Sequence, residues 1–157
     1  FIEQGATRID FMWQPNAAQT LSLRKIGYRE ALIRAGITPN SHYEHEGHID
    51  DPDFIERLIA SGATNIICSN DETAAHLIHA LELHGKTVPT DIRIAGVDDI
   101  KFAQLARVPL TTMAQPCREL GELALNVMIE RITNPSLPAR TISTNATLRV
   151  RESSRIS

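Results

Sequence analysis

The chain has 157 residues, which is enough for one folded unit with a substantial core. Its formal net charge is −3 and its pI is about 6.1, whereas surfaces that bind nucleic acid are normally basic. We therefore expect no DNA contact from this segment itself. The sequence contains no apolar run of the ~20 residues needed to cross a bilayer, so we expect no membrane span.

The cysteines indicate a cellular compartment, and the first residues indicate a longer protein. Cys68 and Cys117 occur in unrelated contexts and do not suggest a disulfide framework, which favours the cytoplasm. Residues 1–5 resemble the last turn of a helix that Gly5 ends. The sequence therefore looks like part of a longer protein.

Hydrophobic periodicity predicts alternating strands and helices. We expect extended segments at 7–13, 43–46, 64–68, 92–97, 111–114 and 141–150, and helices at 17–35, 53–60, 72–84 and 116–132. Gly36 and Gly85 follow two of these helices and are typical helix stops. Because the links are short, the pattern predicts an α/β fold, with a parallel sheet covered on both faces in three α/β/α layers.

Parallel sheets of this kind bind ligands at the carboxyl ends of their strands. The residues that follow the predicted strands are 14–20, Asn70 with Asp71, Asp98 with Asp99, and Gln115. These positions are therefore the candidate site. None of them carries a glycine-rich phosphate loop, so we expect no nucleotide cofactor.

The adjacent carboxylates Asp98 and Asp99 resemble an acid–base pair, but their spacing argues against that chemistry. Neighbouring side chains on an extended segment point to opposite faces, so the two carboxyls do not converge on one bond. We expect Asp98 to contact a ligand, and Asp99 to face the protein or to cap the turn that begins at Ile100. Asn70 is suited either to a ligand contact or to capping, and Arg24 either to a ligand contact or to solvent.

No arrangement of residues predicts catalysis or a metal site. His42, His45 and His48 recur every third residue in a segment where Gly47 argues against a helix, and a solvated surface is the favoured interpretation. Cys117 lies at a predicted helix start, where a thiolate is stabilised, but no partner base is evident. We therefore expect neither enzymatic activity nor a cofactor.

The run over residues 88–128, VPTDIRIAGVDDIKFAQLARVPLTTMAQPCRELGELALNVM, resembles the effector-binding domain of LacI/GalR-type bacterial transcription regulators. The segments GATRIDFM, LRKIGYREALIRAGI, NIICSNDETAAHLIHALELHGKTVP and ATLRVRESS fit the same family in the same order. The resemblance covers essentially the whole chain and implies a periplasmic-binding-protein-like fold of type I. It implies that residues 6–115 and 140–157 form the C-terminal subdomain. The helix at 116–133 would then pack on an N-terminal subdomain outside this sequence.

The resemblance also implies a site and a function. Arg24, Asn70 and Asp98 match the family's effector contacts, Thr20 a small hydroxyl residue near the cleft, and Ile49 the approximate position of an aromatic platform. The implied effector is a sugar or sugar derivative. Operator DNA would be bound by a separate N-terminal module of a cytoplasmic regulator.

Two copies of the chain are expected to associate, and two alternative functions are also considered for the fold. Residues 72–84 and 104–108 match regions that form the subunit interface in the family, so the resemblance implies a homodimer contact that includes Ala75 and Ile78. The main rival function is a periplasmic sugar-binding protein of the same fold, and the second is an α/β enzyme that uses Asp98, Asp99 and Cys117.

The helix at 116–132 carries an apolar stripe that includes Leu120, Leu123 and Val127. Each large apolar side chain gains roughly 1.5–3 kcal/mol when it is fully buried, so an open stripe is costly. We expect the helix either to fold back on its own subdomain or to pack against another copy of the chain.

Overall fold

The computed structural model of the chain describes residues 1–15 and 19–155. Its centre is a six-stranded sheet in the order β2-β1-β3-β4-β5-β6. The strands are β1 (Asp10–Trp13), β2 (Glu44–Glu46), β3 (Asn65–Cys68), β4 (Arg93–Asp98), β5 (Thr111–Ala114) and β6 (Thr147–Arg149). The first five strands are parallel and β6 runs antiparallel to β5, which confirms the predicted α/β class.

The helices follow the strands closely in the chain. They are α1 (Gln19–Arg34), α2 (Pro52–Ala60), α3 (Asp71–Leu83), α4 (Lys101–Leu105) and α5 (Cys117–Thr133), with 3-10 turns at Ser41–Tyr43 and Glu152–Ser154. Gly36 and Gly85 take positive φ angles of 74° and 72°, as expected of residues that end a helix. The predicted helix start at Ala17 lies outside the described residues. Helix α4 was not predicted, because five residues are too few to show a helical period.

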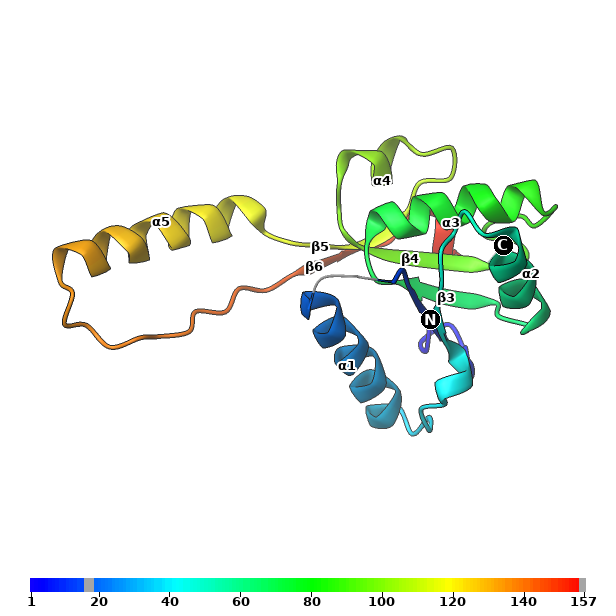
Figure 1. Ribbon diagram of the computed structural model, residues 1–157, viewed down its shortest axis with the longest axis horizontal. Helices are drawn as coiled ribbons and strands as arrows, with labels where there is room; N and C mark the ends of the chain where they lie inside the picture. The colour runs from blue at the N-terminus through cyan, green and yellow to red at the C-terminus, as the bar shows by residue number, and fades with distance from the viewer. Residues whose placement is uncertain (16–18, 156–157) are drawn as a thin grey trace.

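The two faces of the sheet bury two separate clusters, because alternate side chains of a strand point to opposite faces. Ile9 and Phe11 face α1, where they pack with Tyr28 and Leu32. The opposite face packs against α2 and α3 and contributes Met12, Ile66, Cys68 and Ile94 to the larger cluster. Figure 1 shows α1 on one side of the sheet and α2, α3 and α4 on the other, which confirms the three layers.

The 3-10 turn at Glu152–Ser154 is hydrogen-bonded to the centre of the sheet through hydroxyl groups. Ser153 Oγ donates to the Ile94 carbonyl (2.6 Å) and accepts from the Thr111 amide (2.8 Å). The Thr111 and Ser154 hydroxyls lie 2.7 Å apart, and both serines are buried. This segment is not apolar, so hydrogen bonds rather than hydrophobic burial hold it beside β4 and β5.

Helix α5 extends away from the sheet as an arm on a stem that β5 and β6 form (Figure 1). The helix contains no buried residue; Leu120 is 37% exposed and Ile132 is 71% exposed. Of the two expected arrangements, folding back on its own subdomain is therefore wrong, and packing against another copy stays a prediction. Antiparallel pairing of β5 with β6 brings the two ends of the arm side by side, and β6 follows the helix only after the segment 134–146.

None of the described helices combines the length and the apolar character that spanning a membrane requires.

A buried carboxylate anchors the N-terminal end of β1. Asp10 is fully buried and accepts from Arg8 Nε (2.9 Å) and Arg8 Nη2 (2.8 Å). Its Oδ1 also lies 2.8 Å from His45 Nε2 on β2, and Arg8 stacks on the Tyr43 ring at 4.1 Å. One carboxylate thus joins β1 to the edge of the sheet.

We predict that Arg8→Ala lowers the free energy of unfolding by about 3 kcal/mol, because it removes a forked partner from a buried charge. Urea denaturation measures the change. The matched control is Arg34→Ala, whose partner Glu30 and own side chain are both largely exposed. The control should lose no more than about 0.5 kcal/mol. Equal losses for the two variants would contradict the assigned role of Asp10.

Candidate functional site: a polar cleft at the strand ends

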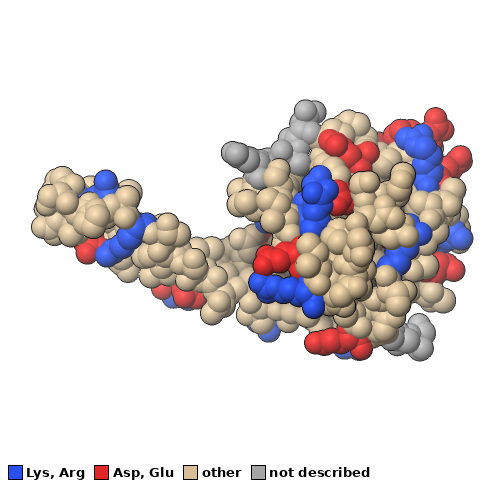
Figure 2. Space-filling model, turned by 90° about the horizontal axis from the view of Figure 1, so that it is seen from below, with Lys and Arg blue, Asp and Glu red and all other residues tan. Residues whose placement is uncertain are grey.

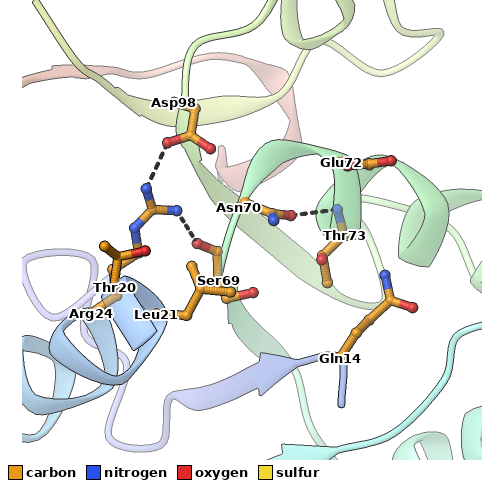
Figure 3. Close-up of a pocket in the computed structure, with 9 residues that line it drawn as sticks. All are labelled: Gln14, Thr20, Leu21, Arg24, Ser69, Asn70, Glu72, Thr73 and Asp98. Carbon is orange, nitrogen blue, oxygen red and sulfur yellow. Dashed lines mark hydrogen bonds and ion pairs between the residues drawn. The ribbon is translucent and has the colours of Figure 1, made fainter. Parts of the chain in front are cut away.

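A polar cleft lies where β1, β3 and β4 end and where α1 and α3 begin (Figure 3). Its lining residues are Gln14, Thr20, Leu21, Arg24, Ser69, Asn70, Glu72, Thr73 and Asp98. Four predicted site residues, Thr20, Arg24, Asn70 and Asp98, therefore meet in one place although 78 positions separate the first from the last. The position agrees with the rule that parallel sheets place ligands at their carboxyl edge.

Arg24 reaches across the cleft from α1. Its Nη1 donates to the Ser69 carbonyl (2.5 Å) and its Nη2 donates to Asp98 Oδ1 (2.7 Å). The Arg24 and Asp98 side chains are 24% and 29% exposed, so this ion pair is partly shielded from solvent. Arg24 is therefore not an ordinary solvated arginine. Because both terminal nitrogens of the guanidinium are hydrogen-bonded, its remaining N–H groups point in fixed directions.

The two adjacent aspartates diverge, which is the arrangement that the extended spacing predicted. Both residues have positive φ, 121° at Asp98 and 55° at Asp99, and this turns the chain sharply at the end of β4. Asp98 faces Arg24, while Asp99 Oδ1 accepts from Arg151 Nη2 at 2.6 Å. The two carboxyls therefore do not form an acid–base pair.

Asp99 faces the protein, as one of its two expected positions had it, and the alternative capping role is wrong. The Ile100 amide at the start of α4 donates instead to Asp71 Oδ2, at 3.0 Å. Asp99 is occupied by Arg151, a partner 52 positions away that no local pattern indicates.

The buried carboxylate of Asp71 links the elements next to the cleft. It is almost fully buried, and it accepts from the Thr112 hydroxyl (2.5 Å) as well as from Ile100. Burial raises the pKa of Asp71, and the hydrogen bonds from Thr112 and Ile100 oppose that rise. A Cβ at position 96 would come within 2.3 Å of Asp71 Oδ1, so Gly96 is required there. The sequence placed Asp71 among the candidate ligand contacts, but its carboxylate is occupied within the protein.

Asn70 combines the two roles that the sequence left open. Its side-chain oxygen accepts from the Thr73 amide at 2.8 Å and so caps α3, and the residue also lines the cleft (Figure 3). Thr20, in the first turn of α1, is exposed at the cleft mouth. The positive end of the α3 dipole faces the same space.

Ile49 is not part of this cleft. It is 5% exposed and packs in the core cluster with α2 and α3, and it lines a separate hollow near His76 and His79. The hydrophobic side chain is buried in the core next to α2, which removes it from any ligand at the strand ends. The cleft's apolar contact comes instead from Leu21, which sequence reasoning missed together with Glu72. The one available signal was their position next to Thr20 and Asp71.

The histidines do not gather into a metal site. Across residues 1–15 and 19–155, no group of three or more His, Cys, Asp or Glu side chains is arranged to hold a metal ion. His45 instead contacts the buried Asp10. Cys68 is buried, and burial raises the pKa of its thiol far above the usual range.

Comparison with known proteins agrees with this architecture. Residues 1–154 match the model of the periplasmic binding protein-like domain family. The chain is 38% identical over 141 residues to the ribose operon repressor of Escherichia coli K12, covering 87% of this chain and 43% of that protein. It is 32% identical over 158 residues to the transcriptional repressor PurR of Photobacterium profundum, covering 98% of this chain and 47% of that protein.

A solved structure shows the same arrangement of elements. The LacI-family transcriptional regulator of Enterococcus faecium with bound ribose superposes with a TM-score of 0.84 at 26% identity, covering 98% of this chain and 58% of that one. The chain therefore belongs to the periplasmic binding protein-like domain family. Its resemblance to the effector-binding domain of LacI/GalR-type regulators is confirmed, and it spans less than half of the length of the two repressors.

We predict that Thr112→Val lowers the free energy of unfolding by about 1–3 kcal/mol, because the Asp71 carboxylate loses a donor inside the protein. The loss should be largest near neutral pH. It should shrink as the pH falls through the raised pKa of Asp71, since a protonated carboxyl needs that donor less. Urea denaturation at several pH values measures both effects.

Thr147→Val on the exposed strand β6 is the matched control and should be nearly neutral. A loss in Thr112→Val that does not change with pH would contradict the role given to Asp71.

Proposed function

We propose that this chain is the C-terminal half of the effector-binding domain of a LacI/GalR-type transcriptional repressor, and that its cleft binds a sugar or sugar derivative. The observation that carries the proposal is the Arg24–Asp98 pair at the carboxyl ends of β3 and β4. Repressors among its relatives, and a related regulator with bound ribose, support the same reading and make ribose the first candidate.

The chemistry of the cleft suits a polyhydroxylated ligand. Each sugar hydroxyl donates one hydrogen bond and accepts others. Asp98 supplies acceptors, Arg24 supplies donors, and Asn70 supplies an amide beside them. Leu21 offers an apolar surface for the C–H face of a sugar ring. Such charged hydrogen bonds are each worth about 1.5–3 kcal/mol when they are shielded from water.

The cleft has one wall in this chain, and we infer that the other wall belongs to an N-terminal subdomain. In this arrangement residues 6–115 and 140–157 form the C-terminal subdomain, and the helix at 116–133 packs on the N-terminal one. The support is the exposed apolar surface of α5, where Leu125, Met128 and Ile129 are each about half exposed. A contiguous apolar face of this kind seldom remains open on a monomer.

Operator binding would lie outside these residues. The chain has a formal net charge of −3, and on the face that Figure 2 shows, acidic and basic side chains are interspersed over the globular part. A DNA surface needs concentrated positive charge. The effector would then act by binding one geometry of the two subdomains better than another, which shifts the equilibrium between forms with different operator affinity.

The rival functions receive less support. A periplasmic sugar-binding protein shares the fold, but the curated relatives compared above are transcriptional repressors. Asp98, Asp99 and Cys117 do line one open hollow at the base of the arm. Both carboxylates are already engaged by arginines, Asp98 by Arg24 and Asp99 by Arg151, and Cys117 is exposed, so the group is not arranged for acid–base or nucleophilic chemistry.

The surface available for a homodimer contact differs from the one that the family resemblance implies. Ile78 is 7% exposed and already packs in the core of a single chain, and Ala75 is only partly exposed. The adjoining surface at α4 is apolar and open, with Phe102 and Leu105 exposed by 73% and 81%, and Leu83 at the end of α3 is 73% exposed. We therefore infer that α4 and the end of α3 form the contact between two copies.

We predict that Arg24→Ala and Asp98→Asn each weaken ribose binding by the full-length regulator about tenfold to a hundredfold, because each removes a charged hydrogen bond to a sugar hydroxyl. Titration calorimetry measures the affinity. Operator affinity without ribose should not change. The matched controls are Arg34→Ala on the same helix and Asp50→Asn on an exposed loop, and both should bind normally. Unchanged ribose binding in both site variants would exclude this cleft as the sugar site.

We predict that Leu105→Glu converts the homodimer into a monomer, because a carboxylate would be buried in an apolar contact. Sedimentation equilibrium measures the mass. Ile33→Glu on α1, another exposed apolar residue that lies away from α4, is the control and should remain dimeric. A dimeric Leu105→Glu variant would place the contact elsewhere.

A further inference from the structure

Gln115 stands between the cleft and the arm. It follows β5 directly and precedes Pro116 and α5, so it is the last residue before the chain leaves the sheet. Its side-chain amide nitrogen donates to Asp98 Oδ1 at 2.5 Å. The Asp98 carboxylate, which faces the cleft, is therefore also hydrogen-bonded by a residue at the base of the arm.

Asp98 receives both of its donors on the same oxygen. Arg24 Nη2 donates to Oδ1 from α1 (2.7 Å), and Gln115 donates to it from the stem of the arm. No described residue donates to Oδ2. Two donors on one oxygen orient the carboxylate and leave the second oxygen available to a ligand hydroxyl.

Asp98 lies between two hollows of the surface. Asp98 lines the cleft together with Arg24 and Asn70, and it also lines a second hollow together with Gln115, Pro116 and Glu119. The carboxylate is thus a wall shared by the cleft and the base of the arm. A change at the base of the arm acts directly on a group that the cleft uses.

Backbone contacts place Gln115 next to both Asp98 and the start of α5. Asp98 and Ala114 are paired in the register of β4 and β5, so Gln115 begins beside Asp98. The Cys117 amide donates to the Gln115 carbonyl at 2.9 Å, which ties the first residue of α5 to Gln115. A rotation of α5 against the sheet therefore displaces the Gln115 side chain.

We propose that Gln115 is a positioning residue that couples the direction of the arm to the orientation of the Asp98 carboxylate. This inference rests on the proposed sugar-binding role of the cleft and extends it. When the arm holds the second subdomain in one direction, Gln115 presents Asp98 to the sugar; when the arm turns, that donor is lost. Because coupling between two events is reciprocal, sugar binding in turn favours the arm direction in which the contact forms.

The first test needs no sugar. Hydrogen–deuterium exchange is measured on the full-length regulator for peptides over residues 96–100 and 111–121, in the wild type and in Gln115→Ala. We expect exchange about two- to tenfold faster in both segments, as the loss of one hydrogen bond predicts. Asp98→Asn should also speed exchange in 111–121, because it weakens the same contact from the other side. Glu119→Gln, in the same hollow, is the control and should match the wild type.

The second test measures coupling with ribose as the probe. Gln115→Ala should bind ribose about two- to tenfold more weakly and should reduce the factor by which ribose changes operator affinity. Gln115→Glu should have a larger effect in the same direction, since it places a second carboxylate against Asp98. The midpoint of thermal unfolding should stay at the wild-type value.

The outcomes separate the two proposals. Unchanged exchange in both segments of Gln115→Ala overturns the role of Gln115, whatever ribose does. Faster exchange throughout the chain with a lower unfolding midpoint also overturns it, because it indicates a general structural role. Weaker ribose binding without faster exchange in 111–121 removes the coupling and leaves a simple site residue. If the wild type binds no ribose, the ribose assignment fails, and the exchange measurements alone decide the contact.

Discussion

The buried carboxylate of Asp71 is the constraint on which the site depends. A charge removed from water must be matched by hydrogen bonds, and Asp71 obtains them from Thr112 on β5 and from the Ile100 amide at the start of α4. The same carboxylate requires Gly96 on β4, because no Cβ fits beside it. One group thus holds together the end of β4, the neighbouring strand and the helix that follows. The sharp turn that presents Asp98 is enclosed by these contacts.

The cleft is built from polar groups that are oriented before any ligand arrives. Arg24 is held by the Ser69 carbonyl and by Asp98, and Asn70 is held by its capping bond to Thr73. Oriented donors and acceptors lose less conformational entropy on binding than free side chains do. The positive φ angles at Asp98 and Asp99 are a local cost that the surrounding contacts stabilise. Strain of this kind is concentrated where the two carboxylates must point in different directions.

The exposed apolar surfaces lie at two separate places, which suggests two different partners. The surface of α5 lies on an arm that leaves the sheet beside the cleft, in line with a second subdomain of the same protein (Figure 1). The surface of α4 adjoins α3 on the globular part, in line with another copy. Hydrophobic burial would provide the driving force for both proposed contacts, but only the arm is joined to the cleft through Gln115.

The sequence by itself determined the alternation of strands and helices and, through it, the parallel sheet. Since ligands meet such a sheet at its carboxyl edge, it also located Thr20, Asn70 and Asp98 within reach of one cleft, whereas Arg24 was assigned through the family resemblance alone. These inferences rest on short-range periodicity and on the residue that follows each strand. Both are local properties that a linear pattern carries.

Only the tertiary structure decided which partner each side chain meets. Asp99 turns to Arg151, Ser153 reaches Ile94, and Ile49 and Ile78 are buried in the core instead of reaching a ligand or a second chain. The arm also projects outward rather than folding back, and antiparallel pairing between β5 and the distant β6 brings its two ends side by side. Each of these outcomes depends on contacts between residues far apart in the chain, and on backbone angles at Asp98 and Asp99 that residue identity alone does not specify.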